Sequence, residues 1–210
     1  MLCQTFADVY IVQVGTTDNN NLLSSLTKKL RLYTKTTLIH WTTSGNSFEI
    51  TNNGTSVTKL AKTSWDDGAL HSTQQLDNTT YMQLKIVETR NAYGDGIFLG
   101  ISNSKTTEKH AHLSNNTICL YNNATSLNHV NIRVLKPCTA VQGDVIGVVV
   151  DMDKDQVRFY INGHLVAVGI PKASAMKPIY AVMWLFYKDM KVEMGDYYLY
   201  HELEAYSGDN

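Results

Sequence analysis

The chain has 210 residues, of which 43% are hydrophobic and 18% are charged, so it can form one sizeable folded domain, alone or with an extension. Its 18 lysines and arginines stand against 19 aspartates and glutamates, which gives a formal net charge of −1. Nucleic acids and anionic membranes attract proteins through clustered surplus positive charge, so this balance argues against both as partners.

The cysteines and the apolar runs indicate where the protein resides. Cys3, Cys119 and Cys138 lie far apart and form no CxxC pair, which argues against a disulfide framework and a structural zinc site. The first residues lack the basic segment and long apolar run of a secretory signal, and no apolar run is long enough to cross a bilayer. We therefore expect a cytoplasmic protein, with cytoskeletal association as a second option.

Residues 1–40 differ in pattern from the rest and are predicted to form an N-terminal extension. Residues 6–14, FADVYIVQV, are typical of a strand. Residues 19–33 place four leucines, from Leu22 to Leu30, at helical spacing after an asparagine run that can cap a helix. The sequence leaves open whether this short amphipathic helix packs on the main domain or binds a partner.

After the extension, the chain is predicted to form short strands separated by turns. FEIT, NNG and TSVTKL follow one another as strand, turn and strand. YMQLKIVE alternates apolar and polar residues, with Met82, Leu84 and Ile86 on one side of the pleat. Further apolar runs follow as GIFLGIS, TICLY, HVNIRVL, PIYAVMWLF and MKVEMG. This pattern predicts an all-β sandwich over residues 41–196.

Residues 143–170, GDVIGVVVDMDKDQVRFYINGHLVAVGI, are predicted to form a three-strand antiparallel meander. Within it, Asn162-Gly163 is a strong hairpin signal because both residues tolerate positive φ. The acidic segment from Asp151 to Asp155 can be interpreted as a calcium loop or as a turn. It lacks the glycine at position six and the glutamate at position twelve of an EF-hand loop, so we predict a turn.

This meander, followed by KPIYAVMWLF, resembles the C-terminal half of a SPRY domain. Upstream, YGDGIFLGIS is similar to the strand of the form G-x-x-x-G-[IV] in that family, and the resemblance extends over residues 41–196. It implies a bent β-sandwich of two antiparallel sheets, in which loops at one rim recognise a protein or peptide. The resemblance is nearest to the SPRY proteins that serve as substrate receptors of ubiquitin ligases, which implies an adaptor or scaffold.

The resemblance also implies which residues bind the partner. In the substrate-receptor group, the binding face uses a tryptophan with its neighbours, after the strand that follows the N-G hairpin. A glycine and its neighbour before the G-[IV] strand contribute as well. The matching positions here are Met183, Trp184, Leu185, Gly94 and Asp95. Leu185 stands where that group has a glycine.

Three aromatic residues are candidate contacts because of their own sequence context. Trp184 lies in the apolar run AVMWLFY, so it is either a core residue or an aromatic anchor at the rim. Trp65, in KTSWDDG, and Tyr93, in RNAYGDG, lie in polar, turn-like segments, where an exposed aromatic side chain indicates binding. For Trp65, a half-buried position over the end of the sandwich is the alternative.

The sequence contains no evident catalytic or metal-binding constellation. His110 and His112, in KHAH, are spaced to project from one face of a strand, but no third ligand lies near them in the sequence. No serine lies in a G-x-S-x-G segment, and no glycine loop leads into a helix, as phosphate binding requires. We therefore expect no metal, no cofactor and no enzymatic activity.

The sequence leaves three functions open. The leading one is a protein–protein interaction module that binds a peptide or protein surface. The second is a structural subunit of a larger cytoskeletal or ciliary assembly, with residues 1–40 and an aromatic and acidic tail over residues 197–210 as tethers. The third is a carbohydrate-binding or glycan-cleaving sandwich, because lectins and some glycosidases share this architecture and fold alone does not decide function.

Overall fold

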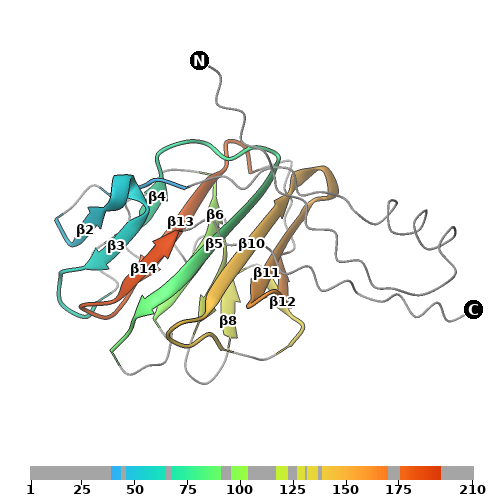
Figure 1. The fold of residues 1–210 in the computed structure, drawn as a ribbon. Coiled ribbons are helices and arrows are strands. Elements are labelled where there is room, and N and C mark those ends of the chain that lie inside the picture. Colours follow the sequence, from blue (N-terminus) through green and yellow to red (C-terminus); the bar gives the residue numbers. More distant parts are fainter. Residues whose placement is uncertain are drawn as a thin grey trace, which may run out of the picture. The chain divides into compact units, whose positions relative to one another are not determined.

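The fold is given by a computed structural model (Figure 1). The structure describes residues 39–43, 46–64, 68–90, 96–103, 117–122, 127–130, 132–136, 139–169 and 176–194. The chain divides into two compact units, Met1–Lys35 and Thr36–Asn210, and all of the described residues belong to the second. The predicted N-terminal strand and helix and the predicted tail lie outside the described residues. Within the described part, no helix is long and apolar enough to cross a membrane.

Two antiparallel sheets form the described part of the second unit. One has the strand order β1-β4-β13-β6-β7-β8. Its strands are β1 (Trp41–Thr42), β4 (Leu70–Ser72), β13 (Tyr180–Leu185), β6 (Ile97–Ser102), β7 (Thr117–Asn122) and β8 (Leu127–Val130). We refer to it as the six-stranded sheet.

The other sheet has the strand order β2-β3-β14-β5-β10-β11-β12-β9 and is referred to as the eight-stranded sheet. Its strands are β2 (Phe48–Thr51), β3 (Ser56–Lys59), β14 (Lys191–Met194), β5 (Thr79–Glu88), β10 (Val145–Asp151), β11 (Gln156–Ile161), β12 (His164–Gly169) and β9 (Ile132–Val134). Two short 3₁₀ helices, η1 (Asn52–Gly54) and η3 (Met152–Lys154), lie in turns. The predicted all-β antiparallel sandwich is confirmed.

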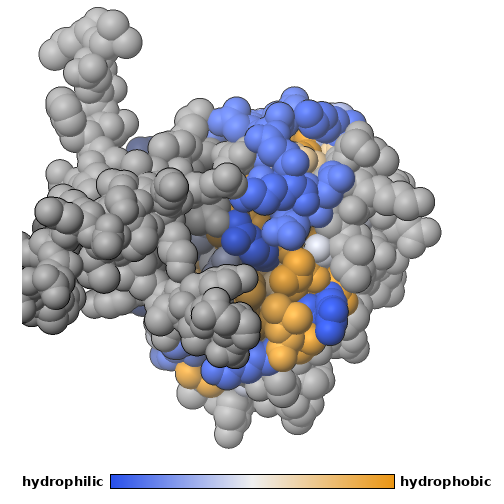
Figure 2. Space-filling view, turned by 90° about the vertical axis from the view of Figure 1, so that its right-hand side faces the viewer, coloured by the Kyte–Doolittle hydropathy of each residue, from blue (hydrophilic) through white to orange (hydrophobic). Residues whose placement is uncertain are grey.

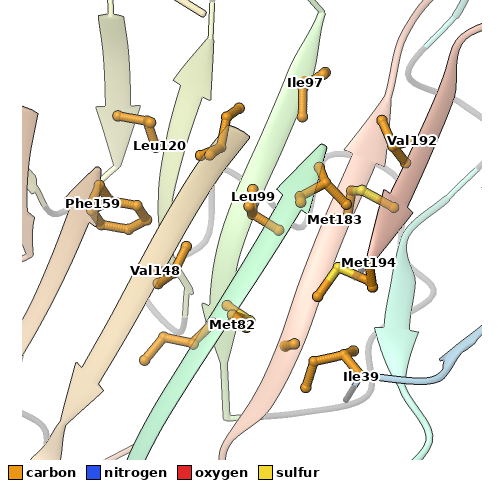
Figure 3. Close-up of a cluster of buried hydrophobic side chains, with 14 of the residues drawn as sticks. Ile39, Met82, Ile97, Leu99, Leu120, Val148, Phe159, Met183, Val192 and Met194 are labelled. Atoms are coloured by element: carbon orange, nitrogen blue, oxygen red, sulfur yellow. The ribbon is translucent and has the colours of Figure 1, made fainter. Parts of the chain in front are cut away.

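The hydrophobic core lies between the two sheets and follows from strand alternation. Met82, Leu84 and Ile86 of β5 are all buried, on the side of the pleat that the sequence predicts. Met82 pairs with Val148 of β10, and Figure 3 shows both side chains in the same apolar layer. The six-stranded sheet contributes Leu99, Leu120 and Met183 to this layer. Each fully buried side chain of this kind stabilises the fold by about 1.5–3 kcal/mol.

The predicted meander forms as β10, β11 and β12. The acidic segment makes the turn η3, in which the Asp151 carboxylate accepts hydrogen bonds from the backbone N–H of Lys154 (3.3 Å) and from its Nζ (2.7 Å). Asn162 takes the predicted positive φ, 48°, between β11 and β12. Its side-chain oxygen accepts from the N–H of Val145 (2.9 Å) and its amide donates to Asp144 (2.8 Å). The hairpin is thereby fastened to the start of β10.

A buried asparagine joins the two sheets at one end. Asn122, the last residue of β7, donates from Nδ2 to the carbonyl of Ala140 (2.9 Å) and accepts at Oδ1 from the N–H of Ala140 (2.9 Å). Ala140 lies in the connection that leads into β10, in the other sheet. Because both residues are buried, this pair satisfies backbone groups that water does not reach.

Apolar residues also reach the surface on the side of the sandwich where β11 and β12 lie. Figure 2 shows an apolar area on this side, with hydrophilic residues above and below it. Leu165 and Val168 of β12 are half-buried, and Leu135, which follows β9, is exposed. Single exposed apolar side chains are common on soluble proteins, so this area alone does not define a binding site.

Candidate functional site

The connections that carry the predicted binding residues leave the sheets at one end of the sandwich. In the six-stranded sheet, β13 ends where β6 begins, because Leu185 pairs with Ile97. In the eight-stranded sheet, β3 and β5 end where β14 begins, because Lys191 pairs with both Thr58 and Glu88. The arrowhead of β5 marks this end in Figure 1. The described residues here, 60–64, Arg90, Gly96 and 186–190, are referred to as the Phe186 rim.

Phe186 joins the connections by backbone hydrogen bonds. Its N–H donates to the carbonyl of Gly96 (2.9 Å), and its carbonyl accepts from the N–H of Ser64 (3.0 Å). Gly96 directly follows the predicted segment from Tyr93 to Asp95, and Ser64 directly precedes Trp65. Phe186 itself follows the predicted segment that ends at Leu185. The described neighbours of all three predicted segments therefore meet at one residue.

The structure locates three of the seven predicted binding residues. Met183 and Leu185 lie on β13 and are buried in the core between the sheets, as Figure 3 shows for Met183. Trp184 lies on the opposite face of β13 and is only 1% exposed. The other four predicted residues lie outside the described residues. They are Trp65, Tyr93, Gly94 and Asp95.

Trp184 is part of an aromatic row on the outer face of the six-stranded sheet. The register places Trp184 opposite Phe98 of β6, and Phe98 opposite Tyr121 of β7. The rings of Phe98 and Tyr121 stack at 4.3 Å, and those of Phe98 and Trp184 meet edge to face at 6.4 Å. Ala69, Cys119 and Val182 complete this second hydrophobic cluster. Of the two interpretations that the sequence leaves open for Trp184, the buried one fits this packing.

A pair of aromatic residues that the sequence did not single out lies on the Phe186 rim. Phe186 and Tyr187 are both half-buried, and their rings meet edge to face at 4.9 Å. The guanidinium of Arg90 lies 5.9 Å from the centre of the Tyr187 ring. A Cβ added to Gly96, whose φ is +84°, would come within 2.9 Å of this ring. Only glycine therefore lets the Tyr187 ring lie across the chain at this position.

Two of the exposed apolar side chains of the described part lie at the same end of the sandwich. Leu60 is 49% exposed, Leu135 47% and Val141 38%, and these are the exposed large hydrophobic residues of the described part. Leu60 follows β3, Leu135 follows β9 and Val141 precedes β10. The register places Leu60 and Val141 at the end of the eight-stranded sheet to which β5 runs, whereas the N–H of Leu135 donates to Val166 near the middle of β12. Apolar and aromatic side chains of this kind suit recognition of another surface.

Metal chemistry finds no support among the residues that the structure describes. They contain no group of three or more histidine, cysteine, aspartate or glutamate side chains that could hold a metal ion. His110 and His112 lie outside the described residues. Asp151, the first residue of the acidic segment, instead pairs with Lys154 (2.7 Å) and lies 4.0 Å from the Arg158 guanidinium.

The thiol of Cys119 is expected to be unreactive in the folded protein. Burial raises the pKa of this thiol because the thiolate is disfavoured away from water, and only the thiolate is nucleophilic. In a Cys3→Ser/Cys138→Ser variant, we expect a chromogenic disulfide reagent to label Cys119 on the order of 100-fold more slowly in buffer than in denaturant. Equal labelling rates in the two solvents would contradict this burial.

Comparison with solved structures agrees with the fold. The TRIM65 PSpry domain superimposes with a TM-score of 0.60 at 13% identity, over 83% of this chain and 99% of that one. The SPRY domain of human HERC1 gives 0.54 at 18% identity, over 70% and 91%. The NHR1 domain of Drosophila melanogaster Neuralized gives 0.52 at 13% identity, over 77% and 99%. At these identities the likeness concerns the fold alone.

Comparison of the sequence identifies the family. A search of curated proteins gives no match. The family model of the SPRY domain matches residues 81–197, which is more than half of the 210 residues. This segment begins within β5 and contains the aromatic pair of the Phe186 rim and the whole meander. The chain belongs to the SPRY domain family.

Proposed function

We propose that this chain is a non-enzymatic interaction module that binds a peptide or protein surface at the Phe186 rim. SPRY domains are generally non-catalytic modules that bind proteins or peptides. The rim is the part of the described surface where half-buried aromatic residues, a guanidinium and the exposed side chain of Leu60 occur together. Aromatic and arginine side chains dominate binding energy at protein interfaces.

One observation carries this proposal, the two backbone hydrogen bonds of Phe186 to Gly96 (2.9 Å) and Ser64 (3.0 Å). They hold together connections that are distant in the sequence, so that several short segments form one surface. Binding sites built from loops on a rigid sandwich are common, because the sheets fix the positions at which the loops begin and end. A partner that contacts one of these connections therefore also reaches the others.

We assign different roles to the two sets of residues at this end. Phe186, Tyr187 and Arg90 are proposed to contact the partner, because their side chains are not fully buried. Trp65, Tyr93, Gly94 and Asp95 stay predicted contacts, since their described neighbours lie on the rim. We propose that Met183, Trp184 and Leu185 fix the position of the rim indirectly, by packing at the end of β13. Their burial argues against direct contact with a partner.

The proposal is tested by selecting peptides from a random display library on the purified protein. We expect Phe186→Ala and Tyr187→Ala each to weaken the selected peptides on the order of 10- to 30-fold, as aromatic hot-spot residues do. Tyr180→Ala is the matched control. Tyr180 is a half-buried tyrosine at the start of β13, whereas Phe186 and Tyr187 directly follow the end of this strand. The affinities are measured by titration calorimetry, after thermal unfolding has shown that each variant is folded.

The outcome also separates the competing functions. Peptides that bind both rim variants as tightly as the unmodified protein, but lose affinity to Tyr180→Ala, would move the site to the other end of the sandwich. A glycan array that gives strong hits, together with a library that gives none, would favour carbohydrate binding. If deletion of residues 1–35, the first unit, abolishes binding while both rim variants retain it, the extension is the tether of a structural subunit.

A further inference from the structure

Lys59, the last residue of β3, is buried between the two sheets. Strand alternation places it on the same face as Val57, which belongs to the hydrophobic core. The residue is 0% exposed, although lysine is rarely buried in this way. An ammonium group inside a protein is costly unless hydrogen bonds replace those that it makes with water. The contacts of Lys59 therefore indicate what the charge does there.

The ammonium of Lys59 reaches across the sandwich to the Phe186 rim. Its Nζ donates to the carbonyl of Leu185 (2.6 Å), at the end of β13 in the opposite sheet. It also donates to the carbonyl of Ser64, at the far end of the connection that follows β3. The ring of Phe48 lies 5.7 Å from Nζ. One side chain thus joins the six-stranded sheet to the connection that precedes Trp65.

The backbone of Lys59 fastens the rest of the rim. Its N–H donates to the carbonyl of Met190 (2.9 Å), and its carbonyl accepts from the N–H of Asp189 (2.8 Å). Residues 186–190 are therefore held at both ends, since Leu185 is bonded to the side chain of Lys59 and Met190 to its backbone. Phe186 and Tyr187, the proposed partner contacts, lie between these two points.

We infer that Lys59 is a positioning residue of the binding site, which holds the connection at residues 60–64 against the end of β13 and so orders the rim before a partner arrives. This inference rests on the proposed function of the rim. A surface that is already ordered loses less conformational entropy on binding, so it binds more tightly than a mobile one. Charge-assisted hydrogen bonds to carbonyl groups are among the stronger ones that a side chain can make.

Replacement by methionine separates this positioning role from the stability of the fold. Met has a similar length and fills the same apolar space, but it cannot donate to the two carbonyl groups. Removing the ammonium also removes the cost of burying its charge, which offsets part of the cost of leaving the carbonyls of Ser64 and Leu185 without this donor. Lys59→Met is therefore expected to loosen the rim while the sandwich stays folded, and Lys59→Arg retains a charged donor.

Amide hydrogen exchange measured by NMR tests the inference without any ligand. In Lys59→Met, we expect the amides of Ser64 and Phe186 to exchange on the order of 10-fold faster, while Val148 in the centre of β10 is unchanged. Lys59→Arg should recover part of the protection. Lys191→Met is the matched control, because this half-exposed lysine of β14 pairs with the half-exposed carboxylate of Glu193 (3.5 Å). Unchanged exchange at Ser64 and Phe186 would overturn the inference.

Peptide binding then tests whether the ordering matters for recognition. Peptides selected on the unmodified protein should bind Lys59→Met at least about fivefold more weakly, with Lys59→Arg in between. Faster exchange with unchanged peptide affinity would overturn the positioning role, and would leave the proposed site intact. A separate result would refute the proposed site, namely peptides whose affinity is unchanged by Phe186→Ala and Tyr187→Ala. If Lys59→Met does not fold, the inference is tested by the rate at which the ammonium protons of Lys59 exchange with water in the unmodified protein. Rapid exchange would refute the buried hydrogen bonds.

Discussion

Trp184→Ala is expected to destabilise the protein by about 3–5 kcal/mol, the usual cost of truncating a buried tryptophan. Trp184 is fully enclosed and its ring meets Phe98 edge to face, so its removal leaves a large cavity beside the aromatic row. For a chain of this size, the midpoint of thermal unfolding should fall on the order of 10 °C. Denaturant unfolding followed by fluorescence measures the free energy directly.

Tyr121→Ala is the comparison that gives this result its meaning. Tyr121 stacks on Phe98 in the same row, but it is only partly buried. Its truncation should therefore cost clearly less than that of Trp184. A Trp184→Ala variant as stable as the unmodified protein would show that the indole is not enclosed. Because Trp184→Ala perturbs the fold, a loss of partner binding in this variant would not identify Trp184 as a contact.

Asn122→Ala is expected to destabilise the protein by about 2–4 kcal/mol. The variant removes both hydrogen bonds to Ala140 and leaves a buried N–H and a buried carbonyl without their partner, each of which costs about 1–3 kcal/mol. Some of this cost is recovered if water enters the space of the lost side chain. The free energy of unfolding in urea measures the effect.

Gln142→Ala provides a matched control for this prediction. Gln142 also uses a side-chain amide to bond a backbone group, accepting from the N–H of Thr89 (3.2 Å), but it is exposed. Water can replace that bond, so the change should stay within about 0.5 kcal/mol. If Asn122→Ala were as mild as Gln142→Ala, the tie between the sheets would contribute little to stability.

The sheets could be predicted because the information lies in neighbouring residues. The alternation in YMQLKIVE placed Met82, Leu84 and Ile86 in the core, and the turn residues at Asn162 and Gly163 placed the hairpin. The acidic segment beginning at Asp151 was correctly predicted as a turn, because it lacked the residues of a calcium loop. Local pattern is sufficient for features of this kind.

The candidate site was harder to predict because its key contacts join distant residues. The role of Phe186 depends on hydrogen bonds to Gly96 and Ser64, and nothing in the apolar run AVMWLFY distinguishes it from a core residue. Lys59 carried a signal that the sequence analysis did not use. In the strand SVTK it shares a face with Val57, so alternation already indicated an inward-pointing lysine.

The hydrogen bonds that hold the Phe186 rim determine which of its residues can be substituted. Lys59 and Phe186 hold the connections through backbone groups of Ser64, Leu185 and Gly96, and Asn122 holds Ala140 in the same way. The side chains of Ser64 and Leu185 take no part in these bonds. New residues could therefore be introduced along the connections while their anchoring is preserved. The same scaffold would then be suitable for directed evolution toward different partners.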